Sequence, residues 1–263
     1  LAVTLVEASP TFTACPFSNN VIAGLRDLKA QQFGYDKLAN DRVTLAMSPA
    51  SAVGAISLSR TDVALPAGSG ADAVRVGNFD GTSGLDIVVP LRNSGEIGVL
   101  LSQGGGAFAP LRRFAACSFP VDVEVGDVTA SGGGVVPDGK PDVVVGCLQS
   151  PAVVVMPGDG AGGFGAPLPT GISRSDIFNL ISGEKADIVS LANLRGGANA
   201  PVIVTRSTPE AGSGSALRGL CASFDWRPGG GEACSPTPYT LRGPIVPANI
   251  SGDPFDEVLG WGS

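Results

Sequence analysis

Oxygen-bearing side chains recur at alternate positions in a glycine-rich stretch, residues 77–89. Asn78, Asp80 and Thr82 occupy the first, third and fifth positions of a loop, and Asp86 occupies the ninth. Alternate residues of a tight loop can direct their oxygens at one centre, and Ca²⁺ is held in proteins by about six to eight oxygens. The spacing therefore predicts a calcium site formed by Asn78, Asp80, Thr82 and Asp86.

A second set of such side chains surrounds an insert. Asp127 and Thr129 begin the pattern, residues 130–137 interrupt it, and Asp138 and Asp142 complete it. These four residues predict a second calcium site. Both ions are expected to be structural, because a cation neutralises clustered carboxylates and rigidifies the turn between two strands. Since Asp and Asn also fill ordinary turns, a hydrogen-bonded turn without metal is the alternative at each loop.

Three weaker copies extend the pattern along the chain. They span residues 27–41, 179–187 and 249–256, and apolar residues follow each of them. The copy at 179–187 lacks oxygen ligands at its middle positions and predicts a metal-free turn, and the copy at 249–256 is one residue short. A period of about 40–50 residues built from short strands is typical of propeller blades.

The loops resemble the FG-GAP/VCBS repeat of integrin-alpha-type propellers, whose consensus is similar to G-D-F-N-G-D-G-x-x-D-[LIV]-V-V. Residues 77–89 match it best, followed by residues 126–128 with 138–145. A second family element, a strand followed by a glycine-rich turn and a Phe, recurs at residues 99–108, 153–164 and 3–12. The resemblance covers most of the chain and implies an all-β propeller with calcium loops.

The order of half-blades predicts how such a ring closes. Residues 1–13 resemble the second half of a blade, and residues 247–263 resemble the first half. We expect one blade to be built from both ends, giving about five blades in a single domain over residues 1–263 and leaving no open sheet edge. Because the family more often has seven blades, a fragment of a seven-bladed propeller is the alternative.

Residues 206–240 are rich in Gly, Ser and Pro and are predicted to form a loop insertion. The insertion carries a candidate partner-binding cluster, namely Phe224, Trp226 and Arg227. Trp and Arg are favoured anchors at protein interfaces, and the flat, amphipathic Trp side chain also suits a sugar ring. The alternative is that Trp226 covers the bottom or edge of a blade.

Two pairs among the five cysteines are candidates for disulfides. Cys117 precedes the strand that enters the second loop, and Cys147 follows the strand that leaves it. Because these strands are expected to pair antiparallel, their sulfurs can meet. Cys221 and Cys234 can close the loop between them, whereas buried free thiols are the alternative. Disulfides and calcium loops both suit an oxidising, calcium-rich compartment.

Composition excludes several functions. The 263 residues carry a net charge of −7, so a nucleic-acid partner, which requires a basic patch, is not expected. No apolar run approaches the roughly 18 residues that cross a bilayer, so the chain is not expected to span a membrane. The chain has no His, which removes the usual general base and zinc ligand. Because no catalytic constellation is found, we do not expect an enzyme.

The expected function is that of an extracytoplasmic binding module, secreted, periplasmic or at a cell surface. It would be stabilised by Ca²⁺ and would take part in adhesion or assembly with a protein or glycan. This expectation depends on the family resemblance, because a fold alone does not determine function. A carbohydrate-binding lectin is the alternative, although only 6% of the residues are aromatic. A polysaccharide lyase on a propeller is the least expected.

Overall fold

The computed structural model describes the greater part of the chain. The described residues are 21–23, 42–47, 59–71, 73–82, 84–129, 136–149, 151–172, 189–195, 201–207, 218–230, 232–237, 241–249, 251 and 253–262. Within these ranges the regular structure consists of β-strands and one short 3₁₀ turn, η1 (Arg92–Ser94). The all-β class predicted from the sequence is therefore confirmed. No long apolar helix that could cross a membrane occurs in the same ranges.

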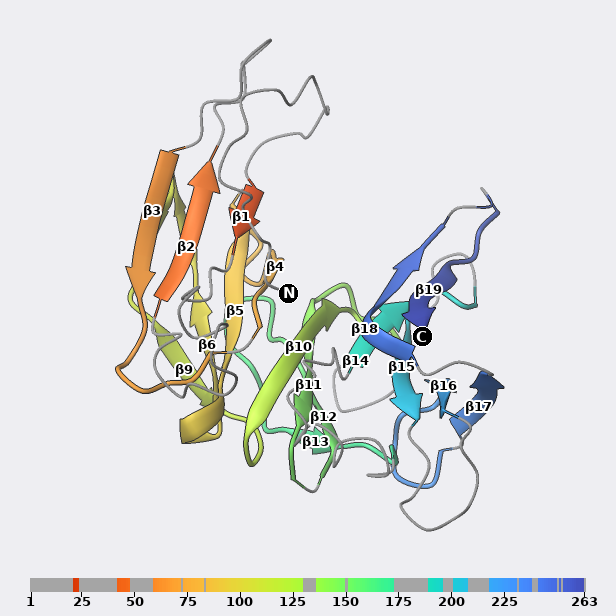
Figure 1. Ribbon diagram of the computed structural model, residues 1–263. Coiled ribbons are helices and arrows are strands. Elements are labelled where there is room, and N and C mark those ends of the chain that lie inside the picture. Colours follow the sequence, from red (N-terminus) through yellow and green to blue (C-terminus); the bar gives the residue numbers. More distant parts are fainter. Residues whose placement is uncertain are drawn as a thin grey trace.

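The strands form antiparallel sheets that follow one another along the chain (Figure 1). The first sheet contains β1 (Val21–Ala23), β2 (Arg42–Met47) and β3 (Ser59–Ala64). The second has the order β4 (Arg75–Gly77), β5 (Asp86–Leu91), β6 (Glu96–Leu100) and β9 (Arg112–Ala115). A hairpin of β7 (Ser102–Gly104) and β8 (Ala107–Phe108) lies in its last connection.

The later sheets repeat this meander, in which strands adjacent in sequence are adjacent in space. The third sheet contains β10 (Pro120–Gly126), β11 (Asp142–Cys147), β12 (Val153–Met156) and β13 (Leu168–Pro169). The fourth contains β14 (Val189–Ala192), β15 (Val202–Ser207), β16 (Arg218–Ser223) and β17 (Glu232–Thr237). The fifth is the pair β18 (Leu241–Ala248) and β19 (Glu257–Gly262).

The second strands of the second and third sheets are buried on both of their faces. β5 reads DIVVPL and β11 reads DVVVGC, and every residue of both strands is buried. Alternate residues of β5 belong to different clusters, because successive side chains of a strand point to opposite faces. Ile87 and Val89 pack with Leu65, which follows β3, whereas Val88 packs with residues of β10 and β11.

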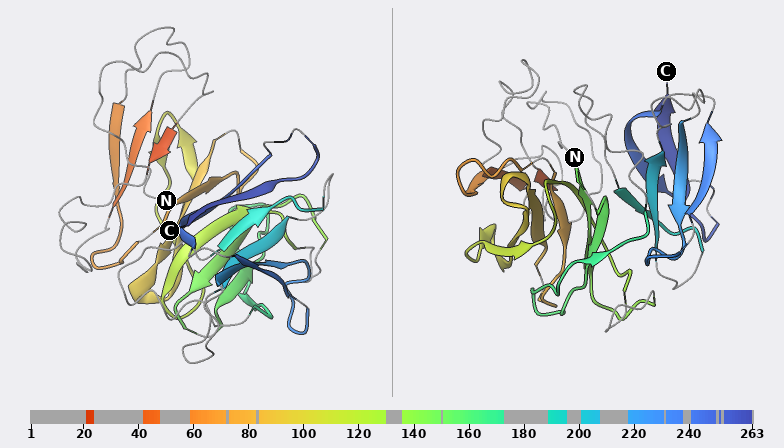
Figure 2. Two further views of the ribbon diagram at one scale, coloured as in Figure 1. Left: turned by 45° about the vertical axis from the view of Figure 1, so that its right-hand side comes forward. Right: turned by 90° about the horizontal axis from the view of Figure 1, so that it is seen from below.

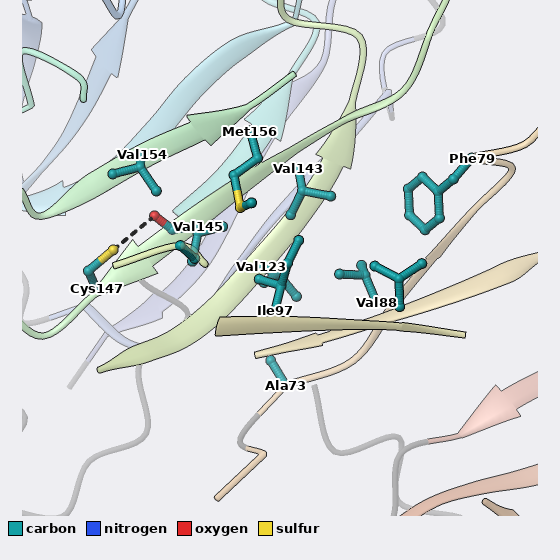
Figure 3. Packing of buried hydrophobic residues seen from close by; sticks show 12 residues of the cluster. Ala73, Phe79, Val88, Ile97, Val123, Val143, Val145, Cys147, Val154 and Met156 are labelled. Atoms are coloured by element: carbon teal, nitrogen blue, oxygen red, sulfur yellow. Dashed lines mark hydrogen bonds between the residues drawn. The ribbon is translucent and has the colours of Figure 1, made fainter. Parts of the chain in front are cut away.

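The hydrophobic cores therefore lie between successive sheets, which pack face to face. One cluster joins the second and third sheets, and Figure 3 shows its members Phe79, Val88, Ile97, Val123, Val143, Val145, Val154 and Met156. Another joins the third and fourth sheets and includes Val144, Val155, Val189, Ile203 and Trp226. Burial of apolar surface between neighbouring sheets is the main force that holds the stack together.

The first strands of successive sheets lie side by side (Figure 2). β4 lies next to β10, β10 next to β14, and β14 next to β18. Polar contacts connect these strands: the Arg75 guanidinium donates to Glu124 Oε1 at 2.9 and 2.6 Å. The buried Asp122 carboxylate accepts the backbone N–H of Val189 at 3.1 Å. The inner edges of three sheets are thus joined by hydrogen bonds as well as by apolar packing.

The described strands do not form a closed barrel or ring. Residues 1–13, which were predicted to close a ring with residues 247–263, lie outside the described part of the chain, as do residues 27–41 and 179–187. Ring closure and the blade count therefore stay predictions.

The prediction of a loop insertion at residues 206–240 is wrong where the structure describes them. β16 and β17 lie within this range and pair continuously, from Arg218 opposite Thr237 to Ser223 opposite Glu232. Gly, Ser and Pro in these strands obscured the alternating pattern in the sequence. Such residues are tolerated because β17 forms the outer edge of its sheet in the described structure, and edge strands accept Pro where central strands do not.

Candidate functional site: the loop face

The loops that carry the predicted ligands lie at one end of the sheets. In an antiparallel meander, the connections from the first to the second strand and from the third to the fourth strand lie at the same end. Hydrogen bonds join such connections between neighbouring sheets. Gly162 N–H donates to Phe79 O at 2.8 Å, and Trp226 Nε1–H donates to Val128 O at 3.1 Å. We call this end the loop face; it consists of the described parts of residues 78–85, 101–111, 127–141, 157–167, 193–201, 224–231 and 249–256.

Asp86 closes the first loop from the start of β5. Its side chain is completely buried, with an exposed fraction of 0%. Oδ2 accepts the backbone N–H of Phe79 at 2.7 Å, and Oδ1 accepts the backbone N–H of Ser102 at 2.8 Å. Phe79 follows β4 and Ser102 follows β6, so one carboxylate ties together the first three strands of the second sheet.

The other three predicted ligands of this loop lie closer to solvent. Asp80 Oδ1 accepts the backbone N–H of Thr82 at 2.9 Å, and Asn78 Nδ2 donates to Thr82 O at 2.6 Å. Burial is the main cause that raises the pKa of Asp86, and the negative charge of Asp80 adds to it. The structure thus brings Asn78, Asp80, Thr82 and Asp86 into one hydrogen-bonded loop.

Asp142 takes the equivalent place in the third sheet and is also completely buried. Its Oδ2 accepts the backbone N–H groups of Val128 and Thr129, both at 2.8 Å. Its Oδ1 accepts the backbone N–H of Gly158 at 2.9 Å and the hydroxyl of Thr129 at 3.2 Å. The same strand ends are joined as in the first loop, because Val128 follows β10 and Gly158 follows β12.

The remaining carboxylates of the second loop are held within it. Asp127 accepts the backbone N–H of Asp138 at 3.0 Å and that of Gly139 at 2.6 Å. Asp138 Oδ1 accepts the backbone N–H of Lys140 at 3.1 Å, and Lys140 Nζ lies 3.7 Å from Asp138 Oδ2. Over the part of the chain that the structure describes, no three Asp, Glu or Cys side chains are grouped to hold a metal ion. Any metal ligation must therefore include amide, hydroxyl or backbone oxygens.

Burial raises the pKa of both Asp86 and Asp142 above the usual value of 3.8. Backbone N–H groups oppose the shift, from Ser102 and Phe79 at Asp86 and chiefly from Gly158 at Asp142. The carboxylate form is disfavoured because water is excluded from it, and the hydrogen bonds compensate only in part.

We expect these two carboxyls to make the protein more stable in mild acid than at neutral pH. Because the pKa of each is higher in the folded protein than in the unfolded chain, their contribution is complete below about 3.8 and is lost as the pH rises through the raised values. Melting temperatures of the wild type and Asp86→Asn between about pH 4 and pH 8, measured after removal of bound metal, test this effect. The variant should lose this component of the pH dependence; parallel curves for the two proteins would contradict the assignment.

The predicted partner-binding cluster is divided by the structure. Trp226 is 4% exposed and packs between the third and fourth sheets, so the prediction of a partner contact at Trp226 is corrected. Phe224 and Arg227 are exposed. Arg195 donates to Phe224 O and lies over its ring, 5.5 Å from the centre. Arg227 forms two hydrogen bonds with Asp225, at 2.8 and 2.7 Å, which lower the pKa of Asp225 to about 2.

The aromatic residues of the last connections pack against the preceding sheet. The Phe164 ring lies 5.3 Å from Phe79 and 5.5 Å from Phe114, in both cases edge to face. Phe108 packs against the cluster that joins the first and second sheets. Trp226 makes the corresponding contact with the third sheet. The strand, turn and aromatic element seen in the sequence therefore connects neighbouring sheets.

Sequence reasoning missed the loop of the fourth sheet, which begins at Asn193 directly after β14 and ends at Pro201 before β15. Asn193 thus corresponds to Asn78, and Pro201 stands where the first loop has its closing aspartate. Asn193 N–H donates to Asp256 Oδ2 at 2.6 Å, so Asp256 connects two sheets. The signal was an Asn at a strand end followed, nine residues later, by the apolar run of β15.

One disulfide predicted from the sequence is confirmed. Cys117 and Cys147 are joined, and they lie at the end of the third sheet opposite the loop face. Cys221 is also a disulfide cysteine, and its backbone is directly opposite Cys234 across β16 and β17.

Comparison of the chain with protein-family models, curated proteins and solved structures finds no match.

Proposed function

We propose that the chain is a β-propeller of the FG-GAP/VCBS type and acts as a non-catalytic binding or assembly module. The observation that carries the proposal is a contact repeated between successive sheets. The carbonyl of the second residue after the first strand accepts a hydrogen bond from the last connection of the next sheet. Gly162 donates to Phe79 in one case, and Trp226 donates to Val128 in the other. If the same contact joins each sheet to the next, each sheet is expected to be related to its neighbour by the same rotation about a common axis, as in a propeller.

Ring closure follows from this arrangement. β18 and β19 pair only with each other among the described strands, and residues 1–13 carry the sequence pattern of the outer half of a sheet. Pairing of these segments gives five blades and leaves no open edge. A fragment of a seven-bladed ring is the alternative, in which further chain would pair with β19.

A structural Ca²⁺ is proposed for the first loop. Asp80 and Asp86 repel each other there, and the amide of Asn78 and the hydroxyl of Thr82 provide neutral oxygens on the same loop. Among the described residues, Asp86 accepts two hydrogen bonds of normal length and a weaker one from the backbone N–H of Asp80, so not all of the roughly four lone-pair sites of its carboxylate are filled. The ion would neutralise the two carboxylates and rigidify the turn between β4 and β5.

An extracytoplasmic location is supported by the bond between Cys117 and Cys147, because structural disulfides persist mainly in oxidising compartments. The same compartments contain enough Ca²⁺ to load sites of modest affinity.

The loop face is the proposed binding surface, and a protein is the proposed partner. Large apolar side chains are exposed there on four consecutive sheets: Leu85, Val136, Phe224 and Phe255. Exposed aromatic and Arg side chains are the common anchors of protein interfaces. Arg195 lies over the Phe224 ring, and Arg227 is held by Asp225 in the same loop.

Site-specific photo-crosslinking in the cells that produce the protein tests this function. We expect a photoreactive phenylalanine at position 224 or 255 to capture a protein on the loop face. Phe119 is the matched control, because it is as exposed as Phe255, at 43%, and lies at the opposite end of the sheets. Equal capture at position 119, or no capture at any position, would contradict the proposal. Binding of purified protein to immobilised glycans, lost on replacing Phe224, would favour the lectin.

A further inference from the structure

The two acidic loops differ in how their buried aspartates are satisfied. We infer that the described ends of the loop at residues 127–142 are closed by their own hydrogen bonds and take no divalent cation, so that any Ca²⁺ on the loop face is held at residues 78–86. The second half of this inference rests on the calcium site proposed above, whereas the first half does not. It departs from the sequence pattern, which predicts a calcium site in both loops.

Four hydrogen-bond donors surround the buried carboxylate of Asp142. An ionised carboxylate offers about four lone-pair sites. All four are used, because each oxygen accepts two hydrogen bonds at 2.8–3.2 Å from Val128, Thr129 and Gly158. A metal ion at this side chain would have to displace a buried hydrogen bond and leave its donor unsatisfied, which is strongly unfavourable. Among the described residues, Asp86 accepts two such bonds, from Phe79 and Ser102, and a weaker one from the backbone N–H of Asp80.

The two loops also differ in the residue at their third position. Thr129 stands where the first loop has Asp80. The Thr129 hydroxyl donates to Asp142 Oδ1, so it stabilises the neighbouring negative charge. The Asp80 carboxylate has no donor to offer, and its Oδ1 itself accepts the backbone N–H of Thr82 at 2.9 Å. The third position of the second loop thus gives a hydrogen-bond donor to its buried aspartate, whereas the third position of the first loop gives a second carboxylate that can bind a cation.

The two carboxylates of the second loop that lie nearer to solvent, Asp127 and Asp138, also accept hydrogen bonds within the loop. Asp127 accepts backbone N–H groups at 3.0 and 2.6 Å. Asp138 accepts a third backbone N–H and lies beside the Lys140 ammonium. The side chains that would have to turn toward an ion instead hold the described ends of the insert together.

Calcium titration of the full chain after removal of bound metal tests the inference. Isothermal titration and melting temperatures at up to about 1 mM free Ca²⁺ cover the range of extracellular sites. We expect one Ca²⁺ per chain. Asp80→Ala should weaken binding by more than about tenfold, and its loop-matched control Asp138→Ala should leave the Kd within about twofold of wild type.

Two ions per wild-type chain would overturn the inference, and this measurement needs no variant to fold. A single ion that is lost in Asp138→Ala and kept in Asp80→Ala would also overturn it. If the wild type binds no Ca²⁺, the cation-free second loop is supported while the calcium site proposed for the first loop is refuted. Circular dichroism of both variants confirms that a lost ion does not reflect unfolding.

Discussion

Replacement of Trp226 by Ala is expected to lower the free energy of unfolding by about 3–5 kcal/mol. The indole is 4% exposed and fills the space between the third and fourth sheets, where Val144, Val155 and Ile203 belong to the same cluster. Its removal leaves a cavity and deprives Val128 O of the Nε1–H donor at 3.1 Å. A fall in Tm of roughly 10 °C in thermal unfolding would accompany this loss.

Two variants separate packing from other effects of this substitution. Trp226→Phe keeps much of the buried area but lacks the donor, so it should cost about 1–3 kcal/mol, in the range of one unsatisfied buried acceptor. Phe224→Ala removes an exposed neighbour and should change the free energy of unfolding by less than about 0.5 kcal/mol. Equal losses for Trp226→Ala and Phe224→Ala would show that Trp226 does not join the sheets.

Loss of the bond between Cys117 and Cys147 is expected to destabilise the protein by about 3–4 kcal/mol. The bond closes a segment with a sequence separation of 30, which contains β10, β11 and the second acidic loop. In the chain-entropy account, the open chain gains conformational freedom in the unfolded state, and the gain depends on the length of the closed segment. Denaturant midpoints of the wild type and a Cys117→Ser/Cys147→Ser variant test this expectation.

The double variant is preferable to a reducing agent, because Cys221 is also disulfide-bonded and would be reduced at the same time. The midpoint of the variant should be lower while its denaturant m-value reports any change in the compactness of the unfolded chain. An unchanged midpoint would mean that the third sheet is held by its strand pairing and cores alone.

Local patterns in the sequence were sufficient for several features. The apolar runs that end the two best copies of the repeat are the strands β5 and β11, and both are completely buried. The spacing of Asn78, Asp80 and Asp86 predicts a tight loop, which is observed. The pairing of Cys117 with Cys147 followed from antiparallel neighbours in the sequence. Each of these features depends on residues close in the chain, whose geometry a short stretch largely determines.

Composition gave a wrong prediction for strands that contain Gly, Ser and Pro. Residues 206–240 were expected to be a loop, because Gly, Ser and Pro are turn formers, yet β16 and β17 lie there. The loop after β14 was missed, because Pro201 stands where the other two loops have an aspartate. Pairing with a neighbouring strand decides such segments, and their intrinsic propensity is a weak guide.

The sequence by itself determined the all-β class, the buried strands and the acidic loops, because these follow from short-range periodicity and spacing. The tertiary structure determined which partners the individual side chains contact. Asp142 is satisfied by donors that include Gly158, sixteen residues further on, and Trp226 is buried against Val128, 98 residues away. No local pattern specifies such partners, because they are set by how successive sheets stack. For that reason, the sequence does not reveal the donors of Asp142, an aspartate of the predicted second calcium site, nor that Trp226, predicted as a contact residue, is part of a core.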